Sequence, residues 1–191
     1  MLALRRVALL KLAGWARVFG ANRAAERWLE TARQEFPDDP RVLAALAFMY
    51  TQQERRREAL ALFDRAAASD PRDAELQFDR GYLLQSLNDH EAASEAFERA
   101  LALNPDHDRA LYGLGLSLIA LRWLDEAVVA LERNTRLQPM SPYGWYQLGR
   151  VQFDRGNRDR TTAIIAHLNR FEPKIAAQLA RDTGLPAPPR P

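Results

Sequence analysis

Five prolines, at Pro37, Pro71, Pro105, Pro139 and Pro173, follow one another at intervals of 34 residues. A fixed period of this length is typical of stacked structural repeats, in which each unit covers the apolar face of its neighbour. The hydrophobic spacing between the prolines is helical. The period therefore predicts an all-α solenoid of antiparallel helix pairs, whose extended concave surface suits the binding of other proteins.

The same residue types recur in each unit once the chain is aligned on its prolines. The first helix carries a large apolar residue, a leucine three positions later and then a small residue, as in Leu43, Leu46, Ala47 and in Trp145, Leu148, Gly149. The second helix repeats a small and a large apolar residue four positions apart, as in Ala59, Phe63 and Ala93, Phe97. These spacings keep the residues on one helical face, where the small ones let two helices approach closely.

This set of positions resembles the tetratricopeptide repeat, a pattern of W-x2-L-G-x2-Y, then A-x3-F, then P. Tyr50, Trp145, Leu148 and Gly149 match it well, and the resemblance covers about residues 6–173. It implies a right-handed superhelical α-solenoid. The repeats are expected at about 6–39, 40–73, 74–107, 108–141 and 142–173.

Local signals place several helix ends. Asp39 and Ser141 each precede a proline and are expected to cap a first helix with a side-chain oxygen. After the fifth repeat we expect a capping helix over 174–184 that ends at Gly184 and covers the last exposed core. Residues 185–191 are proline-rich and are expected to form a disordered tail.

Composition argues against several functions. The chain has no cysteine, and His90, His107 and His167 lie in different repeats without a second ligand at metal-binding spacing. No segment reaches the roughly 18 apolar residues of a membrane span. Met1 to Gly20 contains four basic residues that interrupt its apolar run, so we interpret it as a first-repeat helix and not as a signal peptide. We expect no catalytic site, metal or cofactor.

The resemblance also implies which side chains face the concave groove, because the first helix of each repeat lines it. The predicted partner-binding residues are Arg41, Phe48, Phe78, Tyr82, Arg109, Tyr112, Gly113, Leu116, Tyr143, Tyr146, Gln147, Arg150 and Phe153, and Lys11, Arg17, Gln52, Asp79 and Gln85 share their register. Tyrosine and arginine dominate binding hot spots. The alternative is that some of the aromatic rings in this set pack between neighbouring first helices and do not contact a ligand. Gly113 either opens a pocket beside Phe78, Tyr82, Tyr112 and Tyr146 or relieves crowding between helices.

Chaperone-binding members of this family grip a terminal carboxylate with Lys, Asn and Arg at set groove positions. Here the relevant positions hold Leu10, Gly14, Ala45, Glu75 and Asp79, so that clamp is absent. An apolar or mixed peptide, or an amphipathic helix, is the expected ligand.

The sequence thus predicts a non-enzymatic, bacterial and cytoplasmic adaptor or chaperone-like scaffold that binds a protein or peptide. Residues 1–37 hold 7 basic and 3 acidic residues, whereas residues 72–105 hold 3 basic and 7 acidic ones. This distribution leaves open a self-associating, homo-oligomeric scaffold as the alternative. Binding of single-stranded RNA through tyrosine stacking is a further alternative, but no continuous basic stripe favours nucleic acid.

Overall fold

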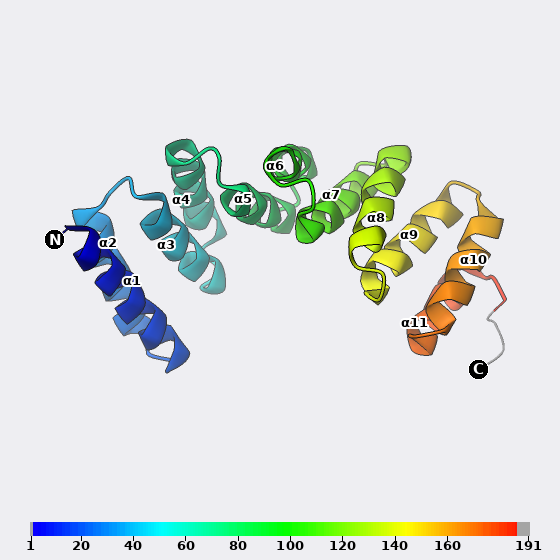
Figure 1. The fold of residues 1–191 in the computed structure, drawn as a ribbon, viewed down its shortest axis with the longest axis horizontal. Helices are drawn as coiled ribbons and strands as arrows, with labels where there is room; N and C mark the ends of the chain where they lie inside the picture. The colour runs from blue at the N-terminus through cyan, green and yellow to red at the C-terminus, as the bar shows by residue number, and fades with distance from the viewer. Residues whose placement is uncertain (1, 187–191) are drawn as a thin grey trace. The chain divides into compact units, whose positions relative to one another are not determined.

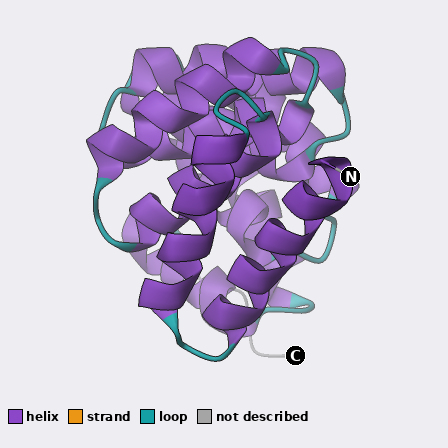
Figure 2. Ribbon diagram, turned by 90° about the vertical axis from the view of Figure 1, so that its left-hand side faces the viewer, coloured by secondary structure: helices purple, strands orange, loops and turns teal. Residues whose placement is uncertain are grey.

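The computed structural model describes residues 2–186, and its regular structure is entirely helical, as Figures 1 and 2 show. The predicted all-α fold is confirmed. The helices are α1 (Leu2–Val18), α2 (Asn22–Glu35), α3 (Pro40–Gln52), α4 (Arg56–Ser69), α5 (Ala74–Ser86), α6 (His90–Leu103), α7 (Asp108–Ala120), α8 (Leu124–Leu137), α9 (Pro142–Asp154), α10 (Arg158–Asn169) and α11 (Pro173–Thr183). None of those in residues 2–186 is long and apolar enough to cross a bilayer.

The helices form two compact units. The N-terminal unit spans residues 1–87 and contains α1 to α5, and the C-terminal unit spans residues 88–191 and contains α6 to α11. Their boundary falls inside the predicted third repeat. One continuous solenoid over residues 1–184 stays a prediction, and residues 187–191 of the predicted tail lie outside the described residues.

The turn between the two helices of each repeat adopts the same backbone conformation. Gly20, Glu54, Asn88, Arg122 and Gly156 all have φ between 61° and 81°, and they are spaced 34 residues apart. A left-handed residue reverses the chain tightly at the end of a helix. Only two of the five are glycine, so the other three carry a conformational cost. The proline period in the sequence is therefore matched by a second period in the backbone.

Helix capping agrees with the sequence at one of the two predicted positions. The Asp39 carboxylate accepts hydrogen bonds from the backbone N–H groups of Arg41 and Val42, as predicted. Ser141 makes no side-chain capping bond to α9, so that prediction was wrong. Because Pro142 already sets the first turn of this helix, α9 begins there without the hydroxyl.

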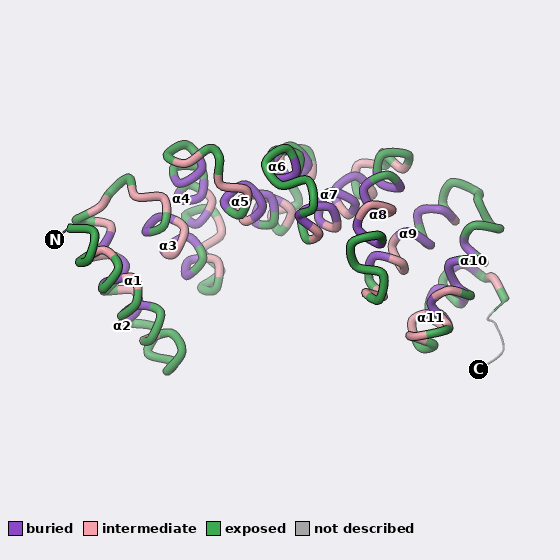
Figure 3. The backbone as a smooth tube through the Cα atoms, in the orientation of Figure 1, coloured by how far each residue is buried: buried purple, intermediate pink, exposed green. Residues whose placement is uncertain are grey.

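Each unit has a core built from the repeated small and large positions. In the N-terminal unit Phe63 and Leu46 are buried against the alanines of neighbouring helices, and in the C-terminal unit Phe97 and Leu131 are fully enclosed. Buried residues (purple in Figure 3) recur on one face of each helix, whereas α1 is mostly exposed. Full burial of one such side chain is worth about 1.5–3 kcal/mol.

The predicted capping helix is present as α11, and it packs against α9 and α10. It ends at Gly184, which has φ 64° and donates its N–H to the carbonyl oxygens of Ala180 and Arg181. Leu179 on its inner face is completely buried and lies against the Cα of Gly149 in α9. This helix therefore covers the apolar surface that the last repeat would otherwise expose.

Candidate functional site: a cleft in the N-terminal unit

The structure divides the predicted groove residues between the two units. Arg41 and Phe48 lie on α3, and Phe78 and Tyr82 lie on α5, all in the N-terminal unit. The remaining nine lie on α7 and α9 of the C-terminal unit, as Arg109, Tyr112, Gly113, Leu116, Tyr143, Tyr146, Gln147, Arg150 and Phe153.

The N-terminal unit contains an open cleft of about 810 Å³ between α1 and α3. Asn22, the first residue of α2, also lines it. The lining residues are Lys11, Gly14, Trp15, Arg17, Val18, Asn22, Met49, Gln52 and Gln53. Three of them, Lys11, Arg17 and Gln52, occupy positions that the repeat register placed in the groove.

Gly14 opens this cleft. A Cβ built on Gly14 would meet no atom within 4 Å, so the helix surface here faces free space. The equivalent positions in the next repeats, at intervals of 34 residues, hold Phe48, Tyr82, Leu116 and Arg150. Only the first repeat lacks a side chain at this position. Because a large residue there would project into the groove, the glycine leaves space for a ligand.

The cleft is positively charged. Lys11 and Arg17 contribute cations, and none of the lining residues is acidic. Arg17 places its Cζ atom 4.6 Å from the centroid of the Phe48 ring, a cation–π contact on a ring that is itself partly exposed. Asn22, Gln52 and Gln53 add amide groups. The arrangement can therefore accept carboxylates beside apolar side chains.

The acidic residues nearest in sequence do not neutralise these cations, because they are paired elsewhere. Glu26 forms an ion pair with Arg55 and accepts a hydrogen bond from Gln53, and Glu35 pairs with Arg5. Glu30 accepts a hydrogen bond from the Tyr50 hydroxyl at 2.8 Å and pairs with Arg33. Burial, followed by this hydrogen bond, raises the pKa of Tyr50. Lys11 has no carboxylate partner within residues 2–186.

In the C-terminal unit, several predicted groove residues bind other parts of the protein. The Tyr146 hydroxyl donates a hydrogen bond to Asp182 of α11 at 2.5 Å, and this bond raises the pKa of Tyr146. Burial raises the pKa of Tyr112, and a hydrogen bond with Gln147 offsets part of that effect. Phe153 lies under the Arg158 guanidinium at 5.6 Å. Tyr143 is 67% exposed.

Gly113 does not open a pocket, and that prediction was wrong. A Cβ at this position would lie 2.5 Å from Cζ of Phe97, a fully buried ring on α6. Gly113 instead allows α6 and α7 to approach closely around that ring. The alternative prediction was that the glycine relieves crowding between two first helices. The structure shows that it relieves crowding against the Phe97 ring, which comes from the second helix of the preceding repeat.

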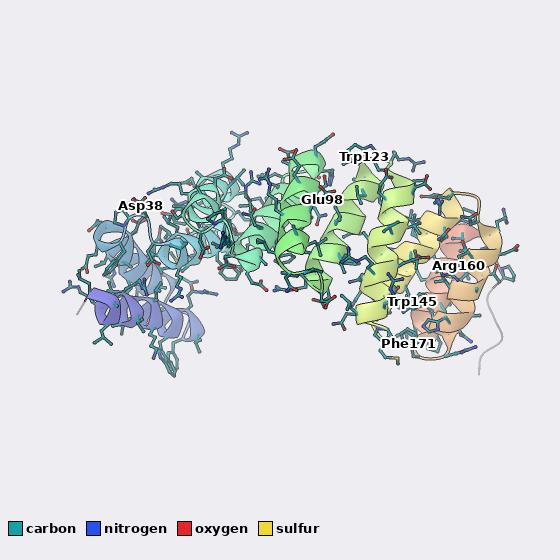
Figure 4. All side chains as sticks on the ribbon, turned by 45° about the horizontal axis from the view of Figure 1, so that its top comes forward. Asp38, Glu98, Trp123, Trp145, Arg160 and Phe171 are labelled. Carbon is teal, nitrogen blue, oxygen red and sulfur yellow. The ribbon has the colours of Figure 1, made fainter. Side chains whose placement is uncertain are left out.

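Three rings of the C-terminal unit, those of Trp145, His167 and Phe171, form a half-buried cluster. Trp145 donates its indole N–H to the carbonyl oxygen of Pro139, and its ring lies 4.3 Å from that of His167. His167 in turn contacts the edge of Phe171 at 5.4 Å. Trp145 and Phe171 are labelled in Figure 4. Residues 2–186 contain no group of three or more His, Cys, Asp or Glu side chains arranged to hold a metal.

Sequence reasoning missed five of the lining residues, namely Trp15, Val18, Asn22, Met49 and Gln53. It placed Gly14 at a groove position, in register with Phe48 and Tyr82, but did not predict that the missing side chain opens a cleft. The contributions of Trp15 and Asn22 depend on how α1 turns into α2. The proline period does not specify that geometry.

Comparison with known proteins agrees with the repeat pattern. Two tetratricopeptide repeat family models match residues 46–111 and 84–146, which together span more than half of the chain. The chain therefore belongs to the tetratricopeptide repeat family. A search of curated protein sequences found no match.

Solved structures with the same fold include MamA, with a TM-score of 0.79 at 20% identity over 94% of each chain. YrrB, described as a TPR protein with an unusual peptide-binding site, has a TM-score of 0.80 at 19% identity, over 91% of this chain and 90% of its own. A tetratricopeptide repeat protein from Parabacteroides merdae has a TM-score of 0.82 at 22% identity, over 95% of this chain and 74% of its own. These similarities establish the solenoid fold.

Proposed function

We propose that this chain is a non-enzymatic protein-binding scaffold, and that the cleft between α1 and α3 holds a segment of its partner. The observation that carries the proposal is the cleft itself, an open space of about 810 Å³ beside Gly14. Its size falls within the range of about 300–1,000 Å³ typical of ligand pockets, which accommodates a few peptide side chains. Family membership and the peptide-binding description of YrrB support this function.

The lining residues suggest the chemistry of the bound segment. Trp15, Val18 and Met49 form apolar walls, while Lys11 and Arg17 supply positive charge. A peptide with an aliphatic or aromatic anchor next to Asp or Glu would complement both features. A cytoplasmic location and a chaperone-like role are compatible with such a scaffold and belong to the proposal.

Peptide selection followed by calorimetry tests this function. A displayed library of random peptides is selected on the intact protein, and the affinity of a recovered peptide is measured for the wild type and for Gly14→Gln. Glutamine favours the helix more than glycine does, so the variant should fold while its side chain occupies the cleft. We expect the affinity to fall at least tenfold and the recovered peptides to be enriched in acidic residues.

A matched pair of charge variants tests the role of Lys11. The chain has only two lysines, Lys11 in the cleft and Lys174 on the exposed surface of α11. Lys11→Gln should weaken the binding of an acidic peptide, and Lys174→Gln should leave it unchanged. Failure to recover any binding peptide, or equal affinity for wild type and Gly14→Gln, would contradict the proposed site.

A further inference from the structure

Helix α1 carries a row of apolar side chains that the rest of the described chain does not cover. Leu4, Ala8, Leu12, Trp15 and Phe19 follow one another at intervals of four, four, three and four residues, which places them on one side of the helix. All five are exposed, and Phe19, just beyond the end of the helix, is 76% exposed. We call these five residues the outer stripe.

The outer stripe is separate from the two faces of α1 that already have a role. Leu9 and Ala13 face the core and are the only buried residues of this 17-residue helix. Gly14 and Val18 line the cleft. Only Trp15 belongs to both the cleft and the outer stripe, and its ring stacks on Phe19 at 6.0 Å. A contiguous exposed apolar surface of this kind marks a contact with another molecule or with a membrane.

The charges around the outer stripe are positive. Helix α1 has four cations, Arg5, Arg6, Lys11 and Arg17, and no acidic residue. Arg5 and Arg6 form ion pairs with Glu35 and Asp39. Lys11 and two exposed arginines of α2, Arg23 and Arg27, have no carboxylate partner within residues 2–186. The surface of the α1–α2 hairpin thus combines apolar side chains with uncompensated positive charge.

These charges argue against a second copy of the chain as the occupant. Pairing two outer stripes would bring together two helices that have no acidic residue and on which Lys11 and Arg17 have no carboxylate partner within residues 2–186. A head-to-tail contact would need an apolar surface at the other end of the chain, but no large apolar side chain of α10 or α11 is exposed among the described residues. Neither arrangement offers both the apolar surface and the negative charge that α1 requires.

We infer that the outer stripe docks the protein on the surface of an anionic phospholipid bilayer, with α1 lying in the interface. A helix with Trp, Phe and Leu on one side and cations beside them is the type that inserts its apolar side about 5–10 Å into the headgroup region. Each uncompensated Lys or Arg near an anionic surface adds attraction. Lys11 can extend its ammonium group to the headgroups while its methylene groups stay among the apolar residues.

Co-sedimentation with vesicles tests the inference. The protein is mixed with vesicles of phosphatidylcholine alone or of phosphatidylcholine with phosphatidylglycerol. The wild type should sediment with the mixed vesicles, bind those of phosphatidylcholine alone much more weakly, and be released in part by salt. The double variant Leu12→Ser, Phe19→Ser removes two members of the outer stripe that do not line the cleft. It should lower vesicle binding at least tenfold.

Trp123→Ser is the matched control, because Trp123 is 51% exposed but lies in the C-terminal unit. It should leave vesicle binding unchanged, and unaltered melting of both variants would show that they fold. Wild-type protein that ignores anionic vesicles would overturn the inference, as would a double variant that sediments like the wild type. Light scattering in lipid-free buffer provides a further check. If the wild type is a dimer and the double variant is a monomer, the inference is overturned and the outer stripe binds a second copy of the chain.

Discussion

The two units use one repeat pattern in opposite ways. In the N-terminal unit, Gly14 faces open space and leaves a cleft between the first helices of two repeats. In the C-terminal unit, the ring of Phe97 fills the space beside Gly113, and Tyr146 is hydrogen-bonded to α11. A glycine in a repeat helix thus leaves open space only where no neighbouring side chain fills it.

The terminal helices show the same contrast. Helix α11 buries Leu179 completely against α9, whereas α1 buries only two residues and exposes its outer stripe. One helix completes a core, and the other presents apolar surface to its surroundings. Matched substitutions in the two units should therefore have different and sometimes opposite effects on stability.

The largest difference is expected for leucine truncation in the two terminal helices. Leu179→Ala removes a fully buried side chain and should lower the free energy of unfolding by about 2–5 kcal/mol. Leu12→Ala on α1 removes a side chain that is 45% exposed, and should change stability by no more than about 0.5 kcal/mol. Urea denaturation of both variants measures the difference, and similar losses would show that α1 is as tightly packed as α11.

Alanine at the two contrasting glycines should change stability in opposite directions. In Gly113→Ala the new Cβ meets the enclosed Phe97 ring, and overpacking of about 1–3 kcal/mol should exceed the helix-propensity gain. In Gly14→Ala nothing obstructs the methyl group, so the helix should gain about 1 kcal/mol. Thermal melting shows the sign of each change. If Gly113→Ala raises the melting temperature, the space beside Gly113 is open and the predicted pocket is present after all.

The left-handed turns provide a test of backbone strain within the C-terminal unit, which contains Asn88, Arg122 and Gly156. Arg122→Gly relieves a strained φ of 64° and should stabilise the protein by up to about 1 kcal/mol, whereas Gly156→Ala should destabilise it by about as much. Asn88→Gly should have a smaller effect than Arg122→Gly, because asparagine tolerates this conformation. Chemical denaturation measures all three, and a destabilising Arg122→Gly would mean that its side-chain contacts outweigh the backbone strain.

The smallest expected effect concerns pH and the contact between Tyr146 and α11. The hydrogen bond to Asp182 raises the pKa of Tyr146 above its ordinary value of about 10, although Arg150 opposes the shift. Because the neutral phenol is favoured in the folded state, this contribution to stability is complete below the unfolded pKa. It is lost as pH rises through the higher folded pKa.

Asp182→Asn should therefore lower the pKa of Tyr146 and reduce the alkaline loss of stability. An absorbance titration of tyrosinate ionisation, with Tyr146→Phe to assign the transition, measures the pKa. If Asp182→Asn leaves the titration curve unchanged, the contact between α9 and α11 is not formed in solution.

Much of the fold could be predicted because it depends on local, periodic signals. The 34-residue spacing of Pro37 and the four prolines that follow it predicted the repeat length. The recurring small and large apolar residues predicted two packed helices in each repeat, and Gly184 predicted the end of α11. Ser141 shows the limit of such signals, because a suitable capping residue is not always used where a proline already fixes the first turn.

The candidate site was less predictable because it depends on contacts between side chains that are distant in sequence. The repeat register correctly placed Lys11, Arg17 and Gln52 on the cleft side of their helices. It could not indicate that Phe97 points at Gly113, or that Tyr146 reaches a carboxylate 36 residues away. Whether a groove position is open or filled is decided by rotamers and helix docking, and the period contains no information about either.

Mapping the bound peptide by amide chemical shifts tests the central claim most directly. A peptide selected on the protein is titrated into isotopically labelled wild type, and the perturbed amides are assigned. The open cleft predicts shifts at Gly14, Asn22 and the end of α3, with the amides of α7 and α9 unaffected. Shifts concentrated on α7 and α9, with α1 and α3 unchanged, would contradict the claim that the N-terminal unit holds the binding site.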